Sequence, residues 1–218
     1  MTLPVSRGLI FCYALSMIIK QRISGMVGTN SYYVNYNDEG YLIDAPDGIG
    51  KWTRELKVEG YPLSLILLTH GHFDHVMGLE EVLSVYPEAA IYLSSEDKSL
   101  VEEGNKEILR SFGIPLSLYS IPSPFIYNDY SSSIGPFRVI KTPGHTKGGV
   151  CLYSEKDGLV FSGDTLFEEG EGRTDLGGDW RVLMDSLKIL CLLPENTTVF
   201  PGHGGKTVIK SEKRRLGF

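Results

Sequence analysis

The residues best suited to chemistry lie close together in residues 69–75 (THGHFDH), which contain the pattern H-x-H-x-D-H. The stretch directly follows residues 63–68 (LSLILL), a short apolar run typical of a strand that is covered on both faces. Imidazole and carboxylate groups are good ligands for Zn²⁺ and similar ions. Four such groups within six residues are enough for two neighbouring ions, so the pattern predicts a metal site. Its potential ligands are His70, His72, Asp74 and His75.

The two other histidines and one further aspartate occupy comparable places in the chain. His145 lies in TPGHT, Asp164 in SGDT and His203 in PGHG, and each follows a predicted strand. All five histidines of the chain are therefore expected in loops at the ends of strands. One histidine in such a place is usually an ordinary surface residue. Five of them are better explained by a shared metal site.

The elements that must position these residues alternate between strand and helix in both halves of the chain. We expect strands at residues 17–23, 31–36, 41–44, 63–68, 90–93, 137–141, 150–154, 159–161 and 197–200. We expect helices at 47–58, 79–86, after 94, at 105–112 and at 180–191. Asp47 is the expected cap of the first helix, and Ser94 with Asp97 forms a capping signature for the third. The pattern indicates two sheets with helices outside them.

The ordered motifs, H-x-H-x-D-H, TPGHT, SGD and PGH, resemble the metallo-β-lactamase superfamily from about residue 17 onward. The resemblance implies an α/β fold, a four-layer αββα sandwich with the metals at one edge of the two sheets. It also implies two metal ions linked by a shared aspartate, with His70, His72 and His145 on one ion, Asp74, His75 and His203 on the other, and Asp164 bridging them. Asp44, at the end of YLID, matches the family's first motif and would orient a ligand histidine; a turn-capping aspartate is the alternative.

A dinuclear site of this kind favours hydrolysis. Two ions lower the pKa of a bridging water toward neutrality, which provides a hydroxide nucleophile, and they polarise the substrate carbonyl. Asp74 and Asp164 are the expected catalytic carboxylates beside that hydroxide. We expect two divalent ions, Zn²⁺ first, with Fe and Mn²⁺ as alternatives that accept the same ligands. Cys151 lies in an apolar run and is interpreted as a core residue, not a nucleophile.

Residues 166–179 (LFEEGEGRTDLGGD) resemble the small glyoxalase II-like hydrolases, in which GRTDL follows the bridging aspartate. That group is similar to hydroxyacylglutathione hydrolase, which cleaves the thioester S-lactoylglutathione, so the resemblance implies a small-molecule thioester substrate. Full-length glyoxalase II has a C-terminal helical domain that supplies basic residues to glutathione. Only fifteen residues follow His203 in this sequence. We therefore expect weak discrimination between glutathione thioesters and other small thioesters.

Other functions of the superfamily are alternatives. One is a lactonase or another ester hydrolase. Another is a persulfide dioxygenase, which shares the first motif but uses one iron held by two histidines and an aspartate. The presence of Asp74, His75 and His203 argues against a single-metal enzyme. True β-lactamases of the superfamily have a cysteine where this chain has Asp164, so that activity is not expected. A scaffold protein would be expected to lack ligands, and none is missing.

Two basic residues near the motifs are candidates for contact with an anionic substrate. Arg173 lies in the GRTDL segment and Lys147 directly follows the TPGHT motif. The alternatives are an ordinary loop ion pair for Arg173 and a solvated surface lysine for Lys147. Residues 210–215 near the end of the chain are rich in lysine and arginine, and we interpret them as a solvated, charged end.

Composition limits the class of protein. Hydrophobic residues make up 42% of the 218 residues and charged residues 22%, which is typical of a soluble globular protein. The net charge of −6 argues against nucleic acid as a partner. Three scattered cysteines with no CxxC pair favour reduced thiols and a cytoplasmic protein.

The start of the chain contains the apolar run 9–19 (LIFCYALSMII), which is too short for the roughly 20 residues that cross a bilayer. We expect no membrane partner. We expect the metallo-β-lactamase-like domain to occupy residues 17–218 and residues 1–16 to be an N-terminal extension outside the core. A signal or anchor segment, or an additional packed element, are the alternatives for residues 1–16.

Overall fold

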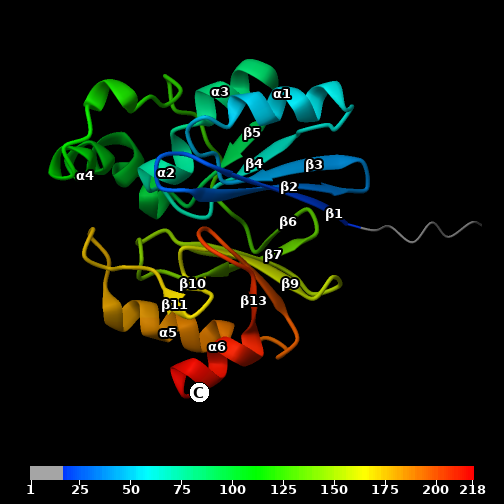
Figure 1. The fold of residues 1–218 in the computed structure, drawn as a ribbon, viewed down its shortest axis with the longest axis vertical. Helices are drawn as coiled ribbons and strands as arrows, with labels where there is room; N and C mark the ends of the chain where they lie inside the picture. The colour runs from blue at the N-terminus through cyan, green and yellow to red at the C-terminus, as the bar shows by residue number, and fades with distance from the viewer. Residues whose placement is uncertain (1–16) are drawn as a thin grey trace, which may run out of the picture.

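The computed structural model describes residues 17–218, in which two β-sheets pack face to face and helices cover both outer faces (Figure 1). The four layers follow the order helix, sheet, sheet, helix, which confirms the predicted αββα architecture. The prediction for residues 1–16 lies outside the described residues. None of the helices in the described part of the chain has both the length and the apolar character that a membrane crossing needs.

The first sheet has the strand order β1-β2-β3-β4-β5, antiparallel up to β3 and parallel from there. Its strands are β1 Ile18–Ser24, β2 Thr29–Tyr36, β3 Glu39–Ile43, β4 Leu65–Leu67 and β5 Ala90–Tyr92. Helices α1 (Gly50–Val58) and α3 (Leu79–Val85) cover its outer face, where apolar residues of the helices and the sheet form one buried cluster. Because β4 is covered by helices on one side and by the second sheet on the other, its sequence is wholly apolar.

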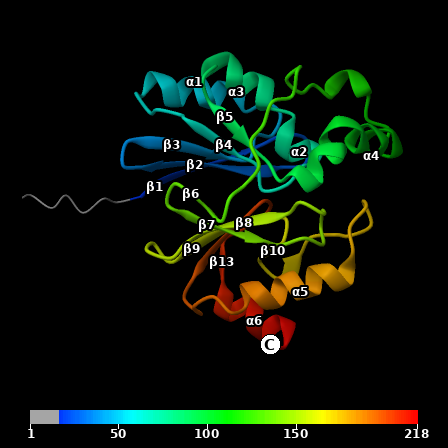
Figure 2. The ribbon, with the colours of Figure 1, turned by 180° about the vertical axis from the view of Figure 1, so that it is seen from behind.

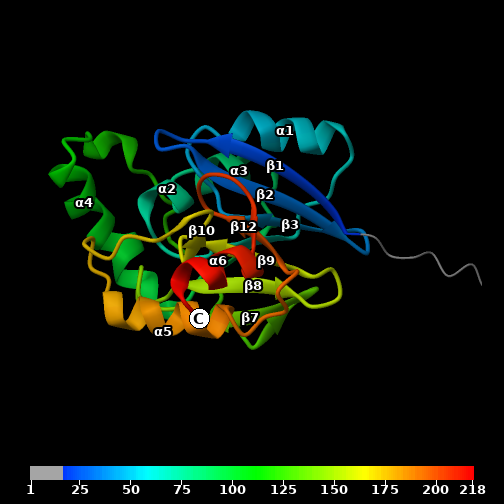
Figure 3. The same cartoon turned by 60° about the horizontal axis from the view of Figure 1, so that its bottom comes forward.

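The second sheet has the order β13-β12-β9-β8-β7-β6. Its strands are β6 Ser133–Ile134, β7 Phe137–Lys141, β8 Val150–Ser154, β9 Leu159–Gly163, β12 Thr198–Pro201 and β13 Thr207–Val208. Helices α5 (Trp180–Leu190) and α6 (Ile209–Leu216) cover its outer face, as the tilted view in Figure 3 shows. A small hairpin of β10 (Leu166–Phe167) and β11 (Gly170–Glu171) leaves the sheet after β9.

Aromatic side chains fill the space between the two sheets. The ring of Tyr32 from the first sheet lies 5.1 Å from that of Phe161 and 5.5 Å from that of Phe200, both in the second sheet. These large buried rings join the sheets through the hydrophobic effect. The ends of strands from both sheets are thereby held at fixed positions relative to one another.

Short helices gather at one end of the sandwich, where α2 and α4 lie at the same side in Figures 1 and 2. Helix α2 follows β4, and the other short helices lie between β5 and β6. Their bounds are α2 Phe73–Val76, the 3₁₀ helix η1 Ser95–Asp97, the π-helix η2 Leu100–Gly104, α4 Asn105–Ser111 and the 3₁₀ helix η3 Leu116–Leu118.

Two predicted helix caps are wrong. Helix α1 begins at Gly50 after Ile49, and the side chain of Asp47 instead faces the backbone N–H of Met26. Ser94 precedes η1 but its side chain makes no capping hydrogen bond. A cap signature is a local pattern, and in both cases contacts with distant parts of the chain use the carboxylate differently.

The predicted solvated, charged end forms helix α6, in which Lys210, Arg214 and Arg215 are exposed. Ile209 is buried, and Arg215 donates hydrogen bonds to Glu212 within the helix and to Glu171 in the small hairpin. Helix α5 forms where a helix is predicted at residues 180–191; Leu183, Leu187 and Leu190 are buried, but Trp180 at its start is 50% exposed. Trp180 is the first residue of the helix.

Candidate metal centre

The structure brings the seven predicted metal ligands together at one end of the two sheets. Each comes from a segment that follows a strand: β4 for the first motif, β7 for His145, β9 for Asp164 and β12 for His203. Three sets of ligand atoms each lie within 4.8 Å of one another. The first is His70, His72 and His145, here called the three-histidine group, and the second is Asp74, His75 and His203, here called the carboxylate group. The third, His70, His75 and Asp164, takes one residue from each group.

The first motif supplies residues to both groups because it changes conformation at His72. The chain is extended at His72 (φ −65°, ψ 149°), so His70 and His72, two residues apart, face the same side. From Phe73 the chain turns into the single helical turn α2, and the backbone N–H of His75 donates to the carbonyl of His72. This turn directs Asp74 and His75 to the neighbouring position.

The three-histidine group is buried, and its side chains are oriented by hydrogen bonds behind them. Nδ1 of His145 donates to the backbone carbonyl of Arg173 at 2.6 Å, so its Nε2 keeps a lone pair. That Nε2 lies 2.8 Å from Nδ1 of His72. Nδ1 of His70 lies 3.1 Å from Oγ1 of Thr69, whose hydroxyl donates to Asp44. These contacts fix which ring nitrogens face the centre.

Asp44 links the two groups through hydrogen bonds to Thr69, which precedes His70, and to His75. Its carboxylate accepts hydrogen bonds from the backbone N–H of Thr69 and from Nδ1 of His75, both at 2.8 Å. The Nε2 of His75 is therefore directed into the site. Asp44 adopts a left-handed backbone conformation (φ 59°), which is uncommon for a residue other than glycine and is found at functional sites. This is the arrangement expected of a residue that orients a ligand histidine.

The carboxylate group and Asp164 complete the centre. Nε2 of His203 lies 3.1 Å from Oδ2 of Asp74, which also accepts a hydrogen bond from the buried hydroxyl of Thr29 at 2.9 Å. Asp164 lies between the groups: its carboxylate oxygens are 3.3 Å from Nε2 of His75 and 3.6 Å from Nε2 of His145.

Several buried polar atoms of the centre have no hydrogen-bond partner among the described residues. They are Nε2 of His70, His72 and His75 and Oδ1 of Asp164. An unsatisfied buried polar atom costs about 1–3 kcal/mol, so a group of them needs an explanation. Lone pairs that converge from imidazole and carboxylate groups are the environment that binds divalent cations such as Zn²⁺, so the residues fit a metal centre.

The histidines of the metal-free centre differ in the direction in which their pKa values are shifted. Burial and the neighbouring histidines lower the pKa of His72 to about 3 and also lower that of His70. Burial opposes the charged form of His203, but Asp164 and Asp74 raise its pKa to about 9. The pKa of His75 is likewise raised, against burial, by the surrounding carboxylates.

The two aspartates of the centre have lowered pKa values. Burial alone would raise the pKa of Asp74 and of Asp164, but His75 and His203 lower both well below the usual range. Both carboxylates are therefore ionised at neutral pH, which is the form that binds a metal ion.

The ligands open into a cavity of about 360 Å³ with apolar walls. The walls come from the β1–β2 turn, the short helices and the β10–β11 hairpin and include Val27, Phe73, Phe112, Phe167 and Leu176. Of the two predicted substrate residues, the structure brings Arg173 to this cavity, where its guanidinium forms a two-point ion pair with Asp175. Lys147 does not line it and lies instead at a neighbouring cavity of about 440 Å³.

Some residues of the site are missing from the sequence-based prediction. Thr29 and Thr69 contact Asp74 and Asp44 through their hydroxyls, and only the position of Thr69 next to the motif gives a signal for it. The local pattern around Asp97 indicates a helix cap, but its carboxylate forms hydrogen bonds with Gly71 and Thr146 in the loops of the three-histidine group. Phe112 and Leu176, on the cavity wall, have no distinguishing pattern.

Residues 24–203 match the family model described as the metallo-beta-lactamase superfamily. A probable metallo-hydrolase of Streptococcus pyogenes is 34% identical over 98% of this chain and 95% of its own length. The hydroxyacylglutathione hydrolase GloC of Haemophilus influenzae is 33% identical over 72% of this chain and 76% of its own.

Crystal structures with the same fold include two that cover most of this chain. One, TTHA1623 in a di-iron-bound form, has a TM-score of 0.80 and 34% identity and covers 90% of this chain and 98% of that one. The other, described as the BLEG-1 B3 metallo-beta-lactamase, has a TM-score of 0.78 and 35% identity over 90% of this chain and 97% of that one. Both similarities extend over nearly the whole described fold.

Proposed function

The chain belongs to the metallo-β-lactamase superfamily, and from this premise we propose that it is a hydrolase that binds two divalent ions and cleaves small thioesters. The proposal rests on one observation: two complete ligand groups lie side by side with Asp164 between them. A single-metal enzyme has no need of the second group. This favours a dinuclear hydrolase over a single-iron dioxygenase.

The residues proposed for each ion are those of the two groups. One ion would be held by His70, His72 and His145, the other by Asp74, His75 and His203, with Asp164 available to both. When bound, two such ions supply a hydroxide nucleophile at neutral pH and polarise a carbonyl group. Zn²⁺ is the first expectation, and the di-iron form of a 34% identical structure supports Fe as an alternative.

The chain's own residues orient the ligands and shape the substrate cavity. Asp44 and the Arg173 carbonyl hold His75 and His145 with the required nitrogen facing the centre. The apolar walls, with Phe112 and Leu176, exclude water around a bound acyl group and strengthen electrostatic contacts inside. Arg173 is already paired with Asp175, which weakens it as a site for the carboxylates of glutathione.

The thioester proposal has two supports. The identity of 33% with a hydroxyacylglutathione hydrolase covers 72% of this chain. The segment that resembles glyoxalase II-like enzymes forms the β10–β11 hairpin and the following loop, and it lines the cavity with Phe167, Glu171 and Arg173. Cys151 and Cys191 are free and buried, which agrees with a cytoplasmic location, part of the same proposal.

A second candidate is β-lactam hydrolysis, because a structure 35% identical to this chain is described as a B3 metallo-beta-lactamase. The sequence-based expectation against this activity depended only on the residue at position 164. The two candidates share the metal centre and differ in substrate, so an assay separates them.

The deciding experiment combines metal analysis of the purified protein with hydrolysis assays. The substrates are S-lactoylglutathione, acyl thioesters of other small thiols, a lactone and a β-lactam, and oxygen uptake is measured with a persulfide. We expect about two metal ions per chain and thioester cleavage with less than about tenfold preference, or about 1.4 kcal/mol, for the glutathione thioester. Faster β-lactam than thioester cleavage would favour the second candidate. One iron with oxygen uptake and no hydrolysis would overturn both.

A further inference from the structure

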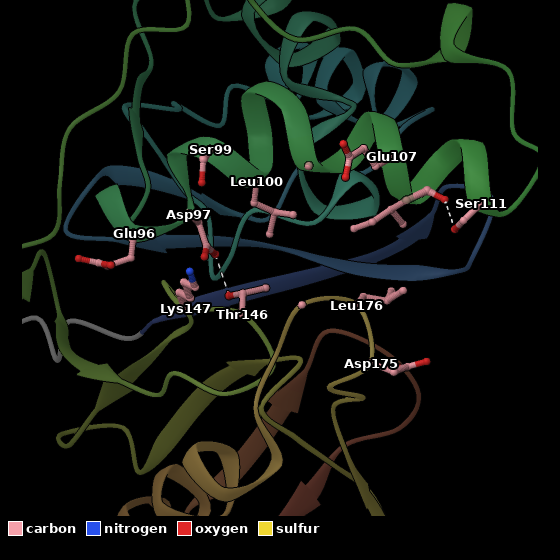
Figure 4. Close-up of a pocket in the computed structure, with 13 residues that line it drawn as sticks. Glu96, Asp97, Ser99, Leu100, Glu107, Ser111, Thr146, Lys147, Asp175 and Leu176 are labelled. Carbon is pink, nitrogen blue, oxygen red and sulfur yellow. Dashed lines mark hydrogen bonds between the residues drawn. The ribbon is translucent and has the colours of Figure 1, made fainter.

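Asp97 is a carboxylate only 1% exposed that lies behind the three-histidine group. Its Oδ2 accepts a hydrogen bond from the backbone N–H of Gly71 at 2.9 Å and from the hydroxyl of Thr146 at 2.7 Å. Its Oδ1 accepts one from the backbone N–H of Gly148 at 2.7 Å. Figure 4 shows Asp97 directed toward Thr146 at the boundary of the 440 Å³ cavity.

All three donors belong to the loops that hold the ligands. Gly71 separates His70 from His72, and Thr146 directly follows His145. Asp97 itself comes from η1, after β5, so one side chain joins three segments that are far apart in the sequence. We propose that Asp97 positions the three-histidine group by fastening its two loops together, an inference that rests on the proposed metal centre.

The two loops approach Asp97 closely, so that only glycine fits at position 148 and a side chain at position 71 would be tightly packed. A Cβ atom at Gly148 would lie 2.7 Å from Cγ of Asp97, and one at Gly71 would lie 3.0 Å from Cβ of Asp97. Real side chains do not approach backbone or a fixed carboxylate at 2.7 Å. The glycines on either side of the carboxylate are therefore part of the same arrangement.

The Gly71 peptide is held from its other side as well. Its carbonyl accepts a hydrogen bond at 2.8 Å from Nδ2 of Asn105, a fully buried residue of α4. With the N–H bound to Asp97 and the carbonyl bound to Asn105, the residue between His70 and His72 has both polar groups of its backbone fixed. The directions of the two flanking histidines follow from that.

The hydrogen bonds to Asp97 have no substitute elsewhere. It forms no ion pair with any residue in 17–218, so its buried carboxylate is satisfied by the three loop donors alone. A buried charge is costly unless it is fully hydrogen-bonded, and charge-assisted bonds are about twice as strong as neutral ones. Movement of either loop would break one of them, which holds the loops in a single arrangement.

The test is Asp97→Asn, which keeps the shape of the side chain but replaces one accepting oxygen by an NH₂ group. In either amide orientation, a backbone N–H of Gly71 or Gly148 faces that NH₂ group. We expect the affinity for the ion of the three-histidine group to fall by about tenfold or more, while the affinity for the other ion stays within about twofold. The measurement is chelator competition on the Co²⁺-loaded protein, followed by the visible absorption spectrum of the bound ions.

A matched control is Glu212→Gln. Glu212 is 2% exposed and its carboxylate also has three hydrogen-bond donors, namely the Thr207 hydroxyl, Arg215 and the N–H of Glu169, but none of these donors belongs to the two loops of the three-histidine group. We expect it to lower the melting temperature as Asp97→Asn does and to leave both Co²⁺ affinities unchanged. Equal metal affinities in Asp97→Asn and Glu212→Gln would show that Asp97 only contributes stability and would overturn the proposal.

A second pair of variants decides the question if Asp97→Asn does not fold. Thr146→Val removes the hydroxyl that bonds to Asp97, and Thr146→Ser retains it. We expect weaker binding of one Co²⁺ ion in the valine variant and near-normal binding in the serine variant; identical binding in the two overturns the proposal. Failure of the wild-type protein to bind two ions would instead refute the proposed function.

Discussion

The three-histidine group and the carboxylate group are neighbours, yet they differ in exposure and in support. The three histidines are buried and lie in front of Asp97, whereas the side chain of His203 in the carboxylate group is 27% exposed at the cavity. The loop of His203 is held by neutral groups: Nδ2 of Asn30 donates to the carbonyl of Pro201 at 2.9 Å, and the hydroxyl of Tyr32 donates to the same carbonyl at 2.8 Å.

The His145 loop and the His203 loop are held in a similar way, but by hydrogen bonds of unequal strength. In each group a side chain from the first half of the chain holds the loop of the histidine from the second half: Asp97 reaches the His145 loop, and Asn30 in β2 reaches the loop after β12. Charge-assisted hydrogen bonds hold the His145 loop, and neutral ones hold the His203 loop. We therefore expect the ion of the carboxylate group to be the weaker bound and the more easily exchanged.

The largest effect is expected from His203→Ala, which removes a ligand from the carboxylate group alone. The metal content should fall from about two ions per chain toward one. Thioester hydrolysis should fall by about a hundredfold or more, since one ion less raises the pKa of the nucleophilic water, and each pKa unit costs up to about tenfold in hydroxide near neutral pH. Metal analysis and kcat/KM measure the two quantities.

The same variant tests the alternative function. A dioxygenase that needs only one iron would keep most of its oxygen uptake with a persulfide after this change. Wild-type protein with one iron, oxygen consumption and no response to His203→Ala would contradict the two-group description.

A pH effect of intermediate size should distinguish the groups in metal-free protein. The pKa of His203 is raised to about 9, against burial, by Asp164 and Asp74, so a proton must leave before metal binds at neutral pH. Co²⁺ uptake by the carboxylate group should tighten by up to about tenfold per unit as the pH rises from 7 toward 9. Titrating metal-free protein with Co²⁺ at several pH values measures this.

The other group provides the internal control for that titration. Burial lowers the pKa of His72 to about 3, so His72 has no proton to release in this range. By linkage, the raised pKa of His203 stabilises the metal-free fold below about pH 6.5, and this contribution is lost as the pH rises through 9. The same pH dependence for both ions would remove the distinction between the groups.

The smallest effect is expected from Asn30→Ala, the counterpart of Asp97→Asn. Two carbonyls of the His203 loop, Pro201 and Gly204, lose the Asn30 amide, but the Tyr32 hydroxyl remains on Pro201. We expect the weaker metal ion to lose less than about tenfold in affinity and the three-histidine ion to be unaffected. Chelator competition measures both metal affinities. A loss of affinity at the three-histidine group instead would contradict the claim that Asn30 supports the carboxylate group.

Local sequence predicted the elements with strong patterns. Residues 137–141 and 150–154 form the expected strands, and the apolar run before the first motif forms β4, because short apolar and alternating runs match the period of a strand. Helix α6 was not expected, since most of its residues are charged. Its stability depends on the burial of Ile209 and on the contact of Arg215 with the distant Glu171.

The sequence alone determined which side chains are available for a metal centre and that each follows a strand, because those properties depend on residue type and local period. The family resemblance implied how they are grouped, and the tertiary structure was needed to find what holds them. Asp97 shows the reason: its local pattern with Ser94 is that of a helix cap, yet its partners are Gly71 and Gly148, 26 and 51 residues away. Contacts over such distances depend on the packing of two sheets, which no local pattern encodes.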